Sequence, residues 1–331
     1  MWYTKFGQSG DIVLSSRVRL ARNFENIPFG SKMTEADRQK VIDNCKDVLP
    51  DLKYIDLSLM TETDKAALSE CHIISREMAS NPDKCGILTN SDCTTCIMLC
   101  EEDHIRIQSM SPGFSLSSCM EKANELDDRI EEKCDLAFDQ KLGYLTCCPT
   151  NVGTALRASV MMHLPALTEN KNMESIIRSL SKIGITVRGF YGEGSQALGN
   201  IYQISNQVTL GVSEEETLSK LEQITLDLIE KERTLGQKIY EQNKFAFEDK
   251  IQRSFGTLTN ARLLSSDEAM NLVSNVKWGI NLGIINNISH ETLNSVWYET
   301  LPANITKAHN TSNAVERDLK RAELFKEALS K

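Results

Sequence analysis

The spacing of apolar and polar residues changes along residues 1–211, with a period of two in some segments and a helical period in others. This pattern predicts a mixture of strands and helices. The β-branched run IVLSSRVRLARN (12–23) opens the fold as an extended segment. The segment TTCIMLCEEDHIRIQSM (94–110) alternates in period two on both sides of an acidic break, so it predicts two strands or one long kinked strand. Residues 185–211 predict a strand, a glycine-rich loop and a second strand.

Helical periodicity marks three segments between these strands. Residues 34–49 predict an amphipathic helix that begins after Thr34 as N-cap. The residues on its packed face are Val41, Cys45, Val48 and Leu49. Residues 118–135 and 172–183 predict two further helices, both rich in charge.

From about residue 213 to the end, the pattern is helical throughout. Breaks are expected at Gly256, Gly279, Gly283 and Pro302. We therefore expect an α+β domain at 1–233 and an all-α domain at 234–331, joined by a long helix that begins near Ser213.

Composition narrows the class of protein. The chain has 331 residues, ten cysteines and a formal net charge of −9, and no run of 18 apolar residues occurs. No export signal is visible at the N-terminus, so we expect a cytoplasmic location and no disulfides. The charge argues against direct binding of nucleic acid. The negative net charge suits a protein that binds basic proteins, although a solvated acidic surface explains the charge more simply.

Five arginines stand in otherwise apolar or glycine-rich surroundings: Arg17, Arg19, Arg106, Arg157 and Arg188. A buried arginine is costly unless it meets an anion, and one such residue usually has a structural carboxylate partner. Five of them suggest a shared polyanion, because guanidinium groups bind phosphate oxygens in bidentate fashion. A nucleoside triphosphate is the obvious candidate.

The stretch YLTCCPTNVGTALRASVMMHL (144–164) adds a thiol to this set. Pro149 and Gly153 predict a sharp turn, so that Cys148 and Arg157 converge on one cleft. Cys147 alternates away from Cys148 and is expected to pack inward. Acidic residues at 101–103 and Glu193 in the glycine-rich loop suit a cationic acceptor, because carboxylates orient guanidinium groups.

Other nucleotide and metal motifs are absent or weak. No GxxxxGK[ST], HRD or DFG motif occurs, and GEGSQALG (192–199) has the wrong spacing for a dinucleotide turn. Cys93 and Cys96 form a single CxxC without a second pair, which makes structural zinc improbable and leaves no metal site. In a strand, Cys96, Met98 and Cys100 would line one face.

Four motifs in this order, SSRVR, EEDHIRIQ, YLTCCPTNVGTALRASV and VRGFYGEGS, resemble the catalytic domain of the phosphagen (guanidino) kinases. The resemblance covers about residues 11–233 and is strongest to the bacterial protein arginine kinases. Small-molecule members carry a helical domain of about a hundred residues before SSRVR, whereas 14 residues precede it here. The resemblance implies a largely antiparallel sheet flanked by helices, of the glutamine-synthetase-like type.

The same resemblance implies roles for residues in those motifs. Glu102 and Glu193 would hold the substrate guanidinium, with the Cys148 thiol beside it. Cys100 stands where the family often has Asn. The residues implied to bind ATP are Ser15, Ser16, Arg17, Val18, Arg19, His72, Arg106, Arg157, Ala158, Ser159, Val160, Met161, Arg188, Gly189, Phe190, Tyr191, Gly192 and Glu193. Mg²⁺ is expected to arrive with ATP.

The C-terminal segment RDLKRA (317–322) is similar to a motif of the protein arginine kinases. Asn313 and Glu316 predict a capping box, and Val315, Leu319, Ala322 and Phe325 predict the packed stripe of the helix. Read alone, the segment is an ordinary solvated helix. The resemblance implies an allosteric pocket for phosphoarginine formed by Arg317, Asp318, Arg321 and Ala322.

The expected activity is therefore ATP-dependent phosphorylation of arginine side chains in proteins. A small-molecule guanidino kinase and a non-catalytic phosphoarginine-binding adaptor are the alternatives. The resemblance also implies a homodimer formed through the helical domain, marking of clients for Clp-type proteolysis, and action on a heat-shock repressor. A ClpC-type chaperone and a zinc-binding activator protein would be its partners.

Overall fold

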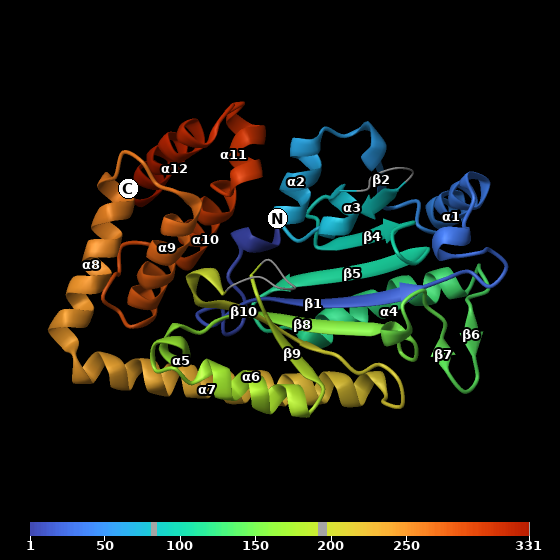
Figure 1. The fold of residues 1–331 in the computed structure, drawn as a ribbon, viewed down its shortest axis with the longest axis horizontal. Helices are drawn as coiled ribbons and strands as arrows, with labels where there is room; N and C mark the ends of the chain where they lie inside the picture. Colours follow the sequence, from blue (N-terminus) through green and yellow to red (C-terminus); the bar gives the residue numbers. More distant parts are fainter. Residues whose placement is uncertain (81–84, 191–196, 331) are drawn as a thin grey trace.

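The computed structural model describes residues 1–80, 85–190 and 197–330, and its centre is a single antiparallel sheet (Figure 1). The strand order is β2-β3-β4-β5-β1-β8-β10-β9, and every neighbouring pair is antiparallel. The strands are β1 (Val13–Arg22), β2 (Lys53–Asp56), β3 (Gly86–Thr89), β4 (Thr95–Leu99), β5 (Ile105–Pro112), β8 (Leu156–His163), β9 (Ile185–Gly189) and β10 (Ile201–Asn206). The expected antiparallel sheet is confirmed, and the acidic break separates two strands, β4 and β5.

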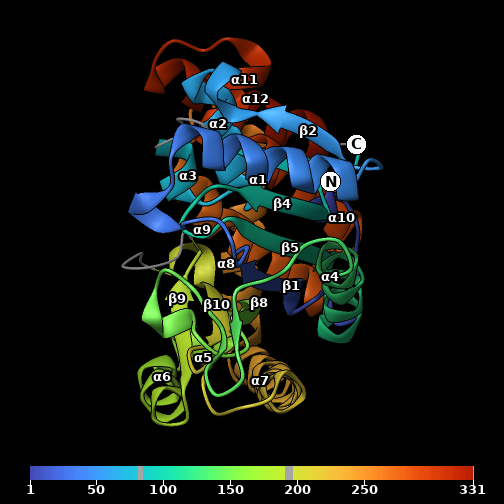
Figure 2. The same ribbon diagram turned by 90° about the vertical axis from the view of Figure 1, so that its right-hand side faces the viewer.

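Helices cover one face of this sheet and its edges. Figure 2 shows α4 (Leu116–Glu131) and α7 (Glu214–Gln242) on the same side. The remaining helices and the small hairpin of this part are α1 (Glu35–Val48), α2 (Glu62–Glu70), α3 (Arg76–Ser80), α5 (Pro165–Glu169), α6 (Met173–Lys182), β6 (Phe138–Asp139) and β7 (Gly143–Tyr144). Short 3-10 turns are η1 (Trp2–Thr4), η2 (Gly30–Lys32), η3 (Leu57–Leu59), η4 (Pro149–Asn151) and η5 (Leu198–Asn200).

The helix starts follow from their capping residues. Thr34 caps α1, accepting from the backbone N–H of Asp37, and Ser213 caps α7 in the same way with Glu216. Both starts match the sequence prediction. The boundary expected between the two domains at residue 233 lies within α7.

The C-terminal part is helical, but two of its expected breaks are wrong. Its helices are α8 (Lys244–Asn260), α9 (Ser266–Asn281), α10 (His290–Glu299), α11 (Pro302–His309) and α12 (Ala314–Leu329). Gly256 lies inside α8 and Gly279 inside α9. A Cβ at Gly279 would stand 2.3 Å from Ile251 of α8, so this glycine permits close helix packing rather than ending a helix. Among the described residues, no helix is long and apolar enough to cross a bilayer.

The packed face of α12 also differs from the prediction. Val315 is 61% exposed and Leu319 is 49% exposed, whereas Arg321 is 1% exposed. Ala322, Phe325 and Leu329 are buried as an amphipathic helix requires. The helix is therefore rotated so that Arg321, and not Leu319, faces its neighbours, because backbone carbonyls there accept from the guanidinium.

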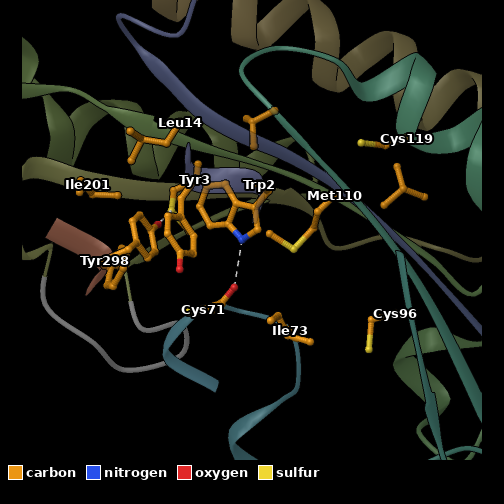
Figure 3. Close-up of a cluster of buried hydrophobic side chains, with 14 of the residues drawn as sticks. Trp2, Tyr3, Leu14, Cys71, Ile73, Cys96, Met110, Cys119, Ile201 and Tyr298 are labelled. Carbon is orange, nitrogen blue, oxygen red and sulfur yellow. Dashed lines mark hydrogen bonds between the residues drawn. The ribbon is translucent and has the colours of Figure 1, made fainter. Parts of the chain in front are cut away.

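An aromatic cluster joins the N-terminus to the helical part. Figure 3 shows the rings of Trp2, Tyr3 and Tyr298 packed together, with the Trp2 indole N–H donating to the Cys71 carbonyl at 3.1 Å. Tyr3 stacks on Tyr298 of α10 with 4.6 Å between ring centroids. Phe190, at the end of β9, packs on the same Tyr298. The helical part is thus bound to the sheet through buried aromatic surface.

Glu232 of α7 provides a pH-dependent contact within the core. Its carboxylate accepts from the backbone N–H groups of Ala166 and Leu167 at the start of α5, at 2.6 and 3.0 Å. The residue is 2% exposed, and burial raises the pKa of its carboxyl to about 7.

We expect Glu232 to make the fold less stable as the pH rises from about 4.5 to about 7. Its pKa is higher in the folded state than in the unfolded chain, so its stabilising effect is complete below pH 4.5 and is lost by about pH 7. The loss amounts to about 3 kcal/mol. Urea unfolding of the wild type and Glu232→Gln at pH 5 and pH 8 measures it. Equal pH dependence in both proteins would show that Glu232 is already ionised at pH 5.

Candidate functional site

Five arginines from four strands share one face of the sheet. Arg19 of β1 lies opposite Arg157 of β8, and Arg17 lies opposite Ser159. Since side chains alternate along a strand, positions two apart and positions directly opposite point the same way. Ala21 of β1, two residues after Arg19, lies opposite Arg106 of β5, which places Arg106 on this face as well.

Arg188 joins the set through β10. It lies opposite Gln203, and Gln203 lies opposite Met161 of β8, which stands two residues beyond Ser159. The register therefore assigns all five arginines, together with Ser15, Ser159 and Met161, to the face opposite α4. We call this the arginine face.

The positive charge of two of these arginines is poorly compensated within the described part of the chain. Arg17 donates to uncharged groups, to the Gln203 Oε1 at 3.1 Å and the Ser159 Oγ at 3.4 Å. Burial, followed by repulsion from Arg106 and Arg157, lowers the pKa of Arg17 to about 10. Burial and neighbouring arginines also lower the pKa of Arg19 well below its usual value, and its buried Nε has no hydrogen-bond partner among residues 1–80, 85–190 and 197–330. Such an arrangement fits an anion that several guanidinium groups share.

His72 lies beside this cluster as a neutral ring. Burial, followed by repulsion from Arg17, Arg76 and Arg19, lowers its pKa to about 3. Its ring packs edge-on against Phe190 with 5.0 Å between centroids, and its buried Nε2 has no hydrogen-bond partner in the part of the chain that the structure describes. His72 therefore offers an uncharged polar atom next to the arginines.

The two glutamates in the loop between β4 and β5 have different surroundings. Glu101 is buried, forms an ion pair with Arg106 at 2.6 Å and accepts from the Ser75 hydroxyl. Glu102 is 42% exposed at its side chain, faces the cleft and contacts Arg106 at 3.3 Å. Burial raises the pKa of Glu102, while Arg106 counteracts this. Glu101 thus holds an arginine in place, and Glu102 is available to a ligand.

Asp103 fixes the thiol segment against this loop. Its Oδ1 accepts from the Cys147 backbone N–H and from the Asn23 Nδ2, both at 2.8 Å. The Cys148 Sγ then lies 3.0 Å from the Thr150 Oγ1, at the start of η4. The sequence grouped Asp103 with the two glutamates as acids that suit a cationic acceptor, whereas its Oδ1 instead holds the Cys147 segment and Asn23.

One cleft of about 720 Å³ brings together Glu102, Cys148 and four of the five arginines, whereas Arg17 and His72 are not among its lining residues. Its lining includes Arg19, Ala21, Glu102, Arg106, Cys148, Pro149, Thr150, Asn151, Ala155, Arg157, Arg188, Gln207, Val208, Thr209 and Leu210. The 207–210 segment was not predicted as part of the site. Its approach depends on the tertiary fold, because it follows the end of β10 and no charge marks it.

Several residues assigned to ATP lie elsewhere on the sheet. Ser16, Val18, Ala158 and Val160 alternate with the arginine face and point toward α4, so only their backbone is near it. The Ser16 hydroxyl, for example, accepts from the backbone N–H of Ser115 just before α4. Tyr191, Gly192 and Glu193 lie outside the described residues. The assigned roles stay predictions.

We expect alkylating reagents to modify Cys148 in preference to Cys147. Burial, followed by the nearby charge of Asp103, raises the pKa of Cys147 to about 12, so almost none of it is thiolate at pH 8. Cys148 lies in the open cleft. Limited iodoacetamide treatment followed by peptide mass spectrometry measures both sites, and ATP should slow the modification of Cys148. Faster labelling of Cys147 would contradict this geometry.

The predicted phosphoarginine residues occupy a separate region on α12. Arg321 donates from Nε to the Thr300 carbonyl at 2.9 Å and from Nη1 to the Leu264 carbonyl at 2.7 Å. It also pairs with Asp318 at 2.6 Å. Arg317 is only partly buried, and Ala322 is buried. Arg321 therefore joins α12 to the end of α10, and its binding role stays a prediction.

Among residues 1–80, 85–190 and 197–330, no group of three or more histidine, cysteine or acidic side chains is arranged to hold a metal ion. Cys96 is buried in β4 and Cys93 is half-buried in the preceding turn. Cys96 shares a strand face with Met98, but Cys100 follows the strand with φ of +58°. That left-handed conformation is one that asparagine adopts readily.

Comparisons with known proteins match the chain along its length. Residues 33–235 match the family model "ATP:guanido phosphotransferase, C-terminal catalytic domain", and residues 244–331 match "Protein-arginine kinase McsB C-terminal domain". A protein-arginine kinase of Bacillus velezensis is 45% identical over 99% of this chain and 93% of its own. The crystal structure of a lombricine kinase superposes with a TM-score of 0.61 at 28% identity, over 70% of each chain. The duplicated taurocyamine kinase of Schistosoma mansoni, with bound transition-state analogue components, gives a TM-score of 0.59 at 29% identity over 68% of this chain and 34% of its own.

Proposed function

The chain belongs to the ATP:guanido phosphotransferase family, and on that basis we propose that it transfers the γ-phosphoryl group of ATP to arginine side chains of proteins. The observation that carries the proposal is the single cleft in which the arginine face meets Glu102 and Cys148. Cationic groups that suit a triphosphate and a carboxylate that suits a guanidinium line one space. The 45% identity to a protein-arginine kinase supports a polypeptide acceptor.

The arginines bind and orient the triphosphate in this proposal. Phosphoryl transfer passes through a loose transition state with charge on the phosphoryl oxygens, so fixed cations stabilise it. Arg17 and Arg19 are half-buried residues of β1, so the sheet holds them in place and they need little reorganisation when this charge develops. Mg²⁺ bound to ATP would supply further neutralisation of the phosphate charge.

Glu102 orients the acceptor nitrogen and receives its proton late. Guanidinium has a pKa of about 13.8 and an ordinary glutamate one of about 4.3, so proton transfer before reaction would cost roughly 13 kcal/mol. The raised pKa of Glu102 reduces this gap only in part. The proton therefore leaves after the forming N–P bond has acidified the nitrogen, and the carboxylate first serves to align it. The Cys148 thiol lines the same cleft and would adjoin the bound acceptor.

The direct test offers the purified protein ATP together with either a basic protein or free arginine. Acid-labile phosphate on the protein, mapped to arginine by mass spectrometry at neutral pH, is the expected product. Labelling of free arginine alone would favour a small-molecule guanidino kinase. Binding of phosphoarginine with no labelling of either substrate would favour a non-catalytic adaptor.

We also propose the regulatory and cellular roles that the family resemblance implies. Phosphoarginine would bind near Arg317 and Arg321, and the products would be clients of a Clp-type protease, among them a heat-shock repressor. A zinc-binding protein would activate the enzyme, and a second copy of the chain would form a homodimer with it. Phosphoarginine titration of wild type and Arg317→Ala, with kinase activity as readout, tests the first of these roles.

A further inference from the structure

Two exposed aliphatic side chains lie in the wall of the cleft and have no part in the reaction described above. Val208 is 46% exposed and Leu210 is 51% exposed, and both line the cavity that contains Glu102 and Cys148. Large apolar side chains that stay exposed inside a binding cleft mark a contact surface for a ligand. We call these two residues the aliphatic rim.

Thr209 explains why the two aliphatic side chains point outward. It is 4% exposed, and its hydroxyl lies 3.0 Å from the Thr150 carbonyl and 2.8 Å from the Val152 carbonyl. Its own carbonyl accepts from the Thr154 N–H at 3.0 Å. Since successive side chains of an extended segment point in opposite directions, anchoring Thr209 inward exposes its neighbours on either side.

Gly153 fixes the rim relative to the thiol. Its φ is +116°, and a Cβ at this position would stand 2.1 Å from the Thr209 carbonyl oxygen. Only glycine allows the 207–210 segment to approach so closely. The contacted segment, 150–154, follows Cys148 after Pro149, so the rim and the thiol belong to one wall of the cleft.

A polypeptide acceptor brings groups to this wall that a free guanidino compound lacks. An extended chain advances about 3.3–3.6 Å per residue, so the residues next to the target arginine stay near the mouth of the cleft. We propose that the aliphatic rim is a specificity subsite for an apolar residue adjacent to the target arginine. This inference rests on the proposed function, because it requires an arginine within a polypeptide.

The test compares two peptides that contain one arginine, with leucine on both sides or glycine on both sides. The wild type should favour the leucine peptide about tenfold in kcat/KM, which corresponds to partial burial of a few aliphatic groups. The double variant Val208→Ser with Leu210→Ser should reduce this ratio to near one. The single variant Leu210→Ser should give an intermediate ratio, and it provides the same readout if the double variant folds poorly.

Leu226→Ser is the matched control, because Leu226 of α7 is 48% exposed and is not among the lining residues of the cleft. It should keep the wild-type ratio. If the rim variants keep the wild-type ratio of kcat/KM between the two peptides, whether or not activity on both peptides falls equally, the subsite is overturned. In either case wild-type labelling of peptide arginine would still support the proposed function. Wild-type labelling of free arginine alone would overturn the proposed function, and the subsite with it.

Discussion

Glu102→Gln is expected to reduce phosphoryl transfer by about 10²- to 10⁴-fold, the usual contribution of a positioned acid–base group. Glutamine keeps the size of the side chain but can neither attract the guanidinium nor accept its proton. ATP should still bind, since the buried arginines are unchanged. Steady-state kinetics combined with ATP titration by calorimetry measures both effects. Because the carboxylate is the active form and its pKa is raised, wild-type activity should fall on the acid side at a pH above the usual glutamate range.

Glu101→Gln is the matched control for this variant. Glu101 is buried and pairs with Arg106 at 2.6 Å, so its loss should destabilise the fold by about 3 kcal/mol. A lower midpoint of urea unfolding is therefore expected. Normal turnover in Glu102→Gln, or loss of ATP binding in it, would contradict the role that the cleft geometry gives to Glu102.

Arg19→Met is expected to stabilise the unliganded protein while greatly reducing its stabilisation by ATP. Arg19 is half-buried among other arginines and its Nε has no hydrogen-bond partner within the described residues, so replacing it by an apolar side chain removes like-charge repulsion and a desolvation cost. The gain should be about 1–2 kcal/mol. At ATP concentrations a hundredfold above the wild-type Kd, binding stabilises the wild type by about 2.7 kcal/mol. A hundredfold weaker affinity in the variant leaves about 0.4 kcal/mol.

Thermal unfolding with and without Mg²⁺ and ATP provides the measurement. The control is Arg253→Met, because Arg253 is a largely exposed arginine of α8 that pairs with Asp249. It should change neither the unliganded stability nor the shift caused by ATP. A drop in the stability of unliganded Arg19→Met would mean that Arg19 has a structural anion as its partner, and the shared triphosphate would then be the wrong interpretation.

The arginine face could be predicted because it depends on local periodicity. Arg17 and Arg19 are two apart in a β-branched run, and side-chain alternation alone places them together. That Arg157 and Arg188 reach the same face follows from strand register, which no single segment reveals. The resemblance of the four motifs had already grouped Arg157 and Arg188 with Arg17 and Arg19 as residues implied to bind ATP.

The failures of prediction share a physical cause. Gly279 was expected to break a helix, since glycine costs about 1 kcal/mol in a helix interior, but close packing on Ile251 of α8 outweighs that cost. Leu319 was expected in the packed stripe but is exposed, because the carbonyl groups at Leu264 and Thr300 bind the Arg321 guanidinium and set the rotation of α12. Intrinsic propensity and hydrophobicity are weak compared with such tertiary contacts.

By itself, the sequence determined most of the helical and extended segments and the charged groups available for chemistry, because these depend on residue patterns within short segments. The antiparallel sheet was expected only from the resemblance of the four motifs, since strand pairing joins segments far apart in the chain. Only the tertiary structure decided that Glu101 is committed to Arg106 while Glu102 is open to a ligand. It likewise placed Val208 and Leu210 beside Cys148. The physical reason is that burial and ion pairing are set by segments far apart in the chain, so two adjacent glutamates of identical chemistry acquire different roles from their surroundings.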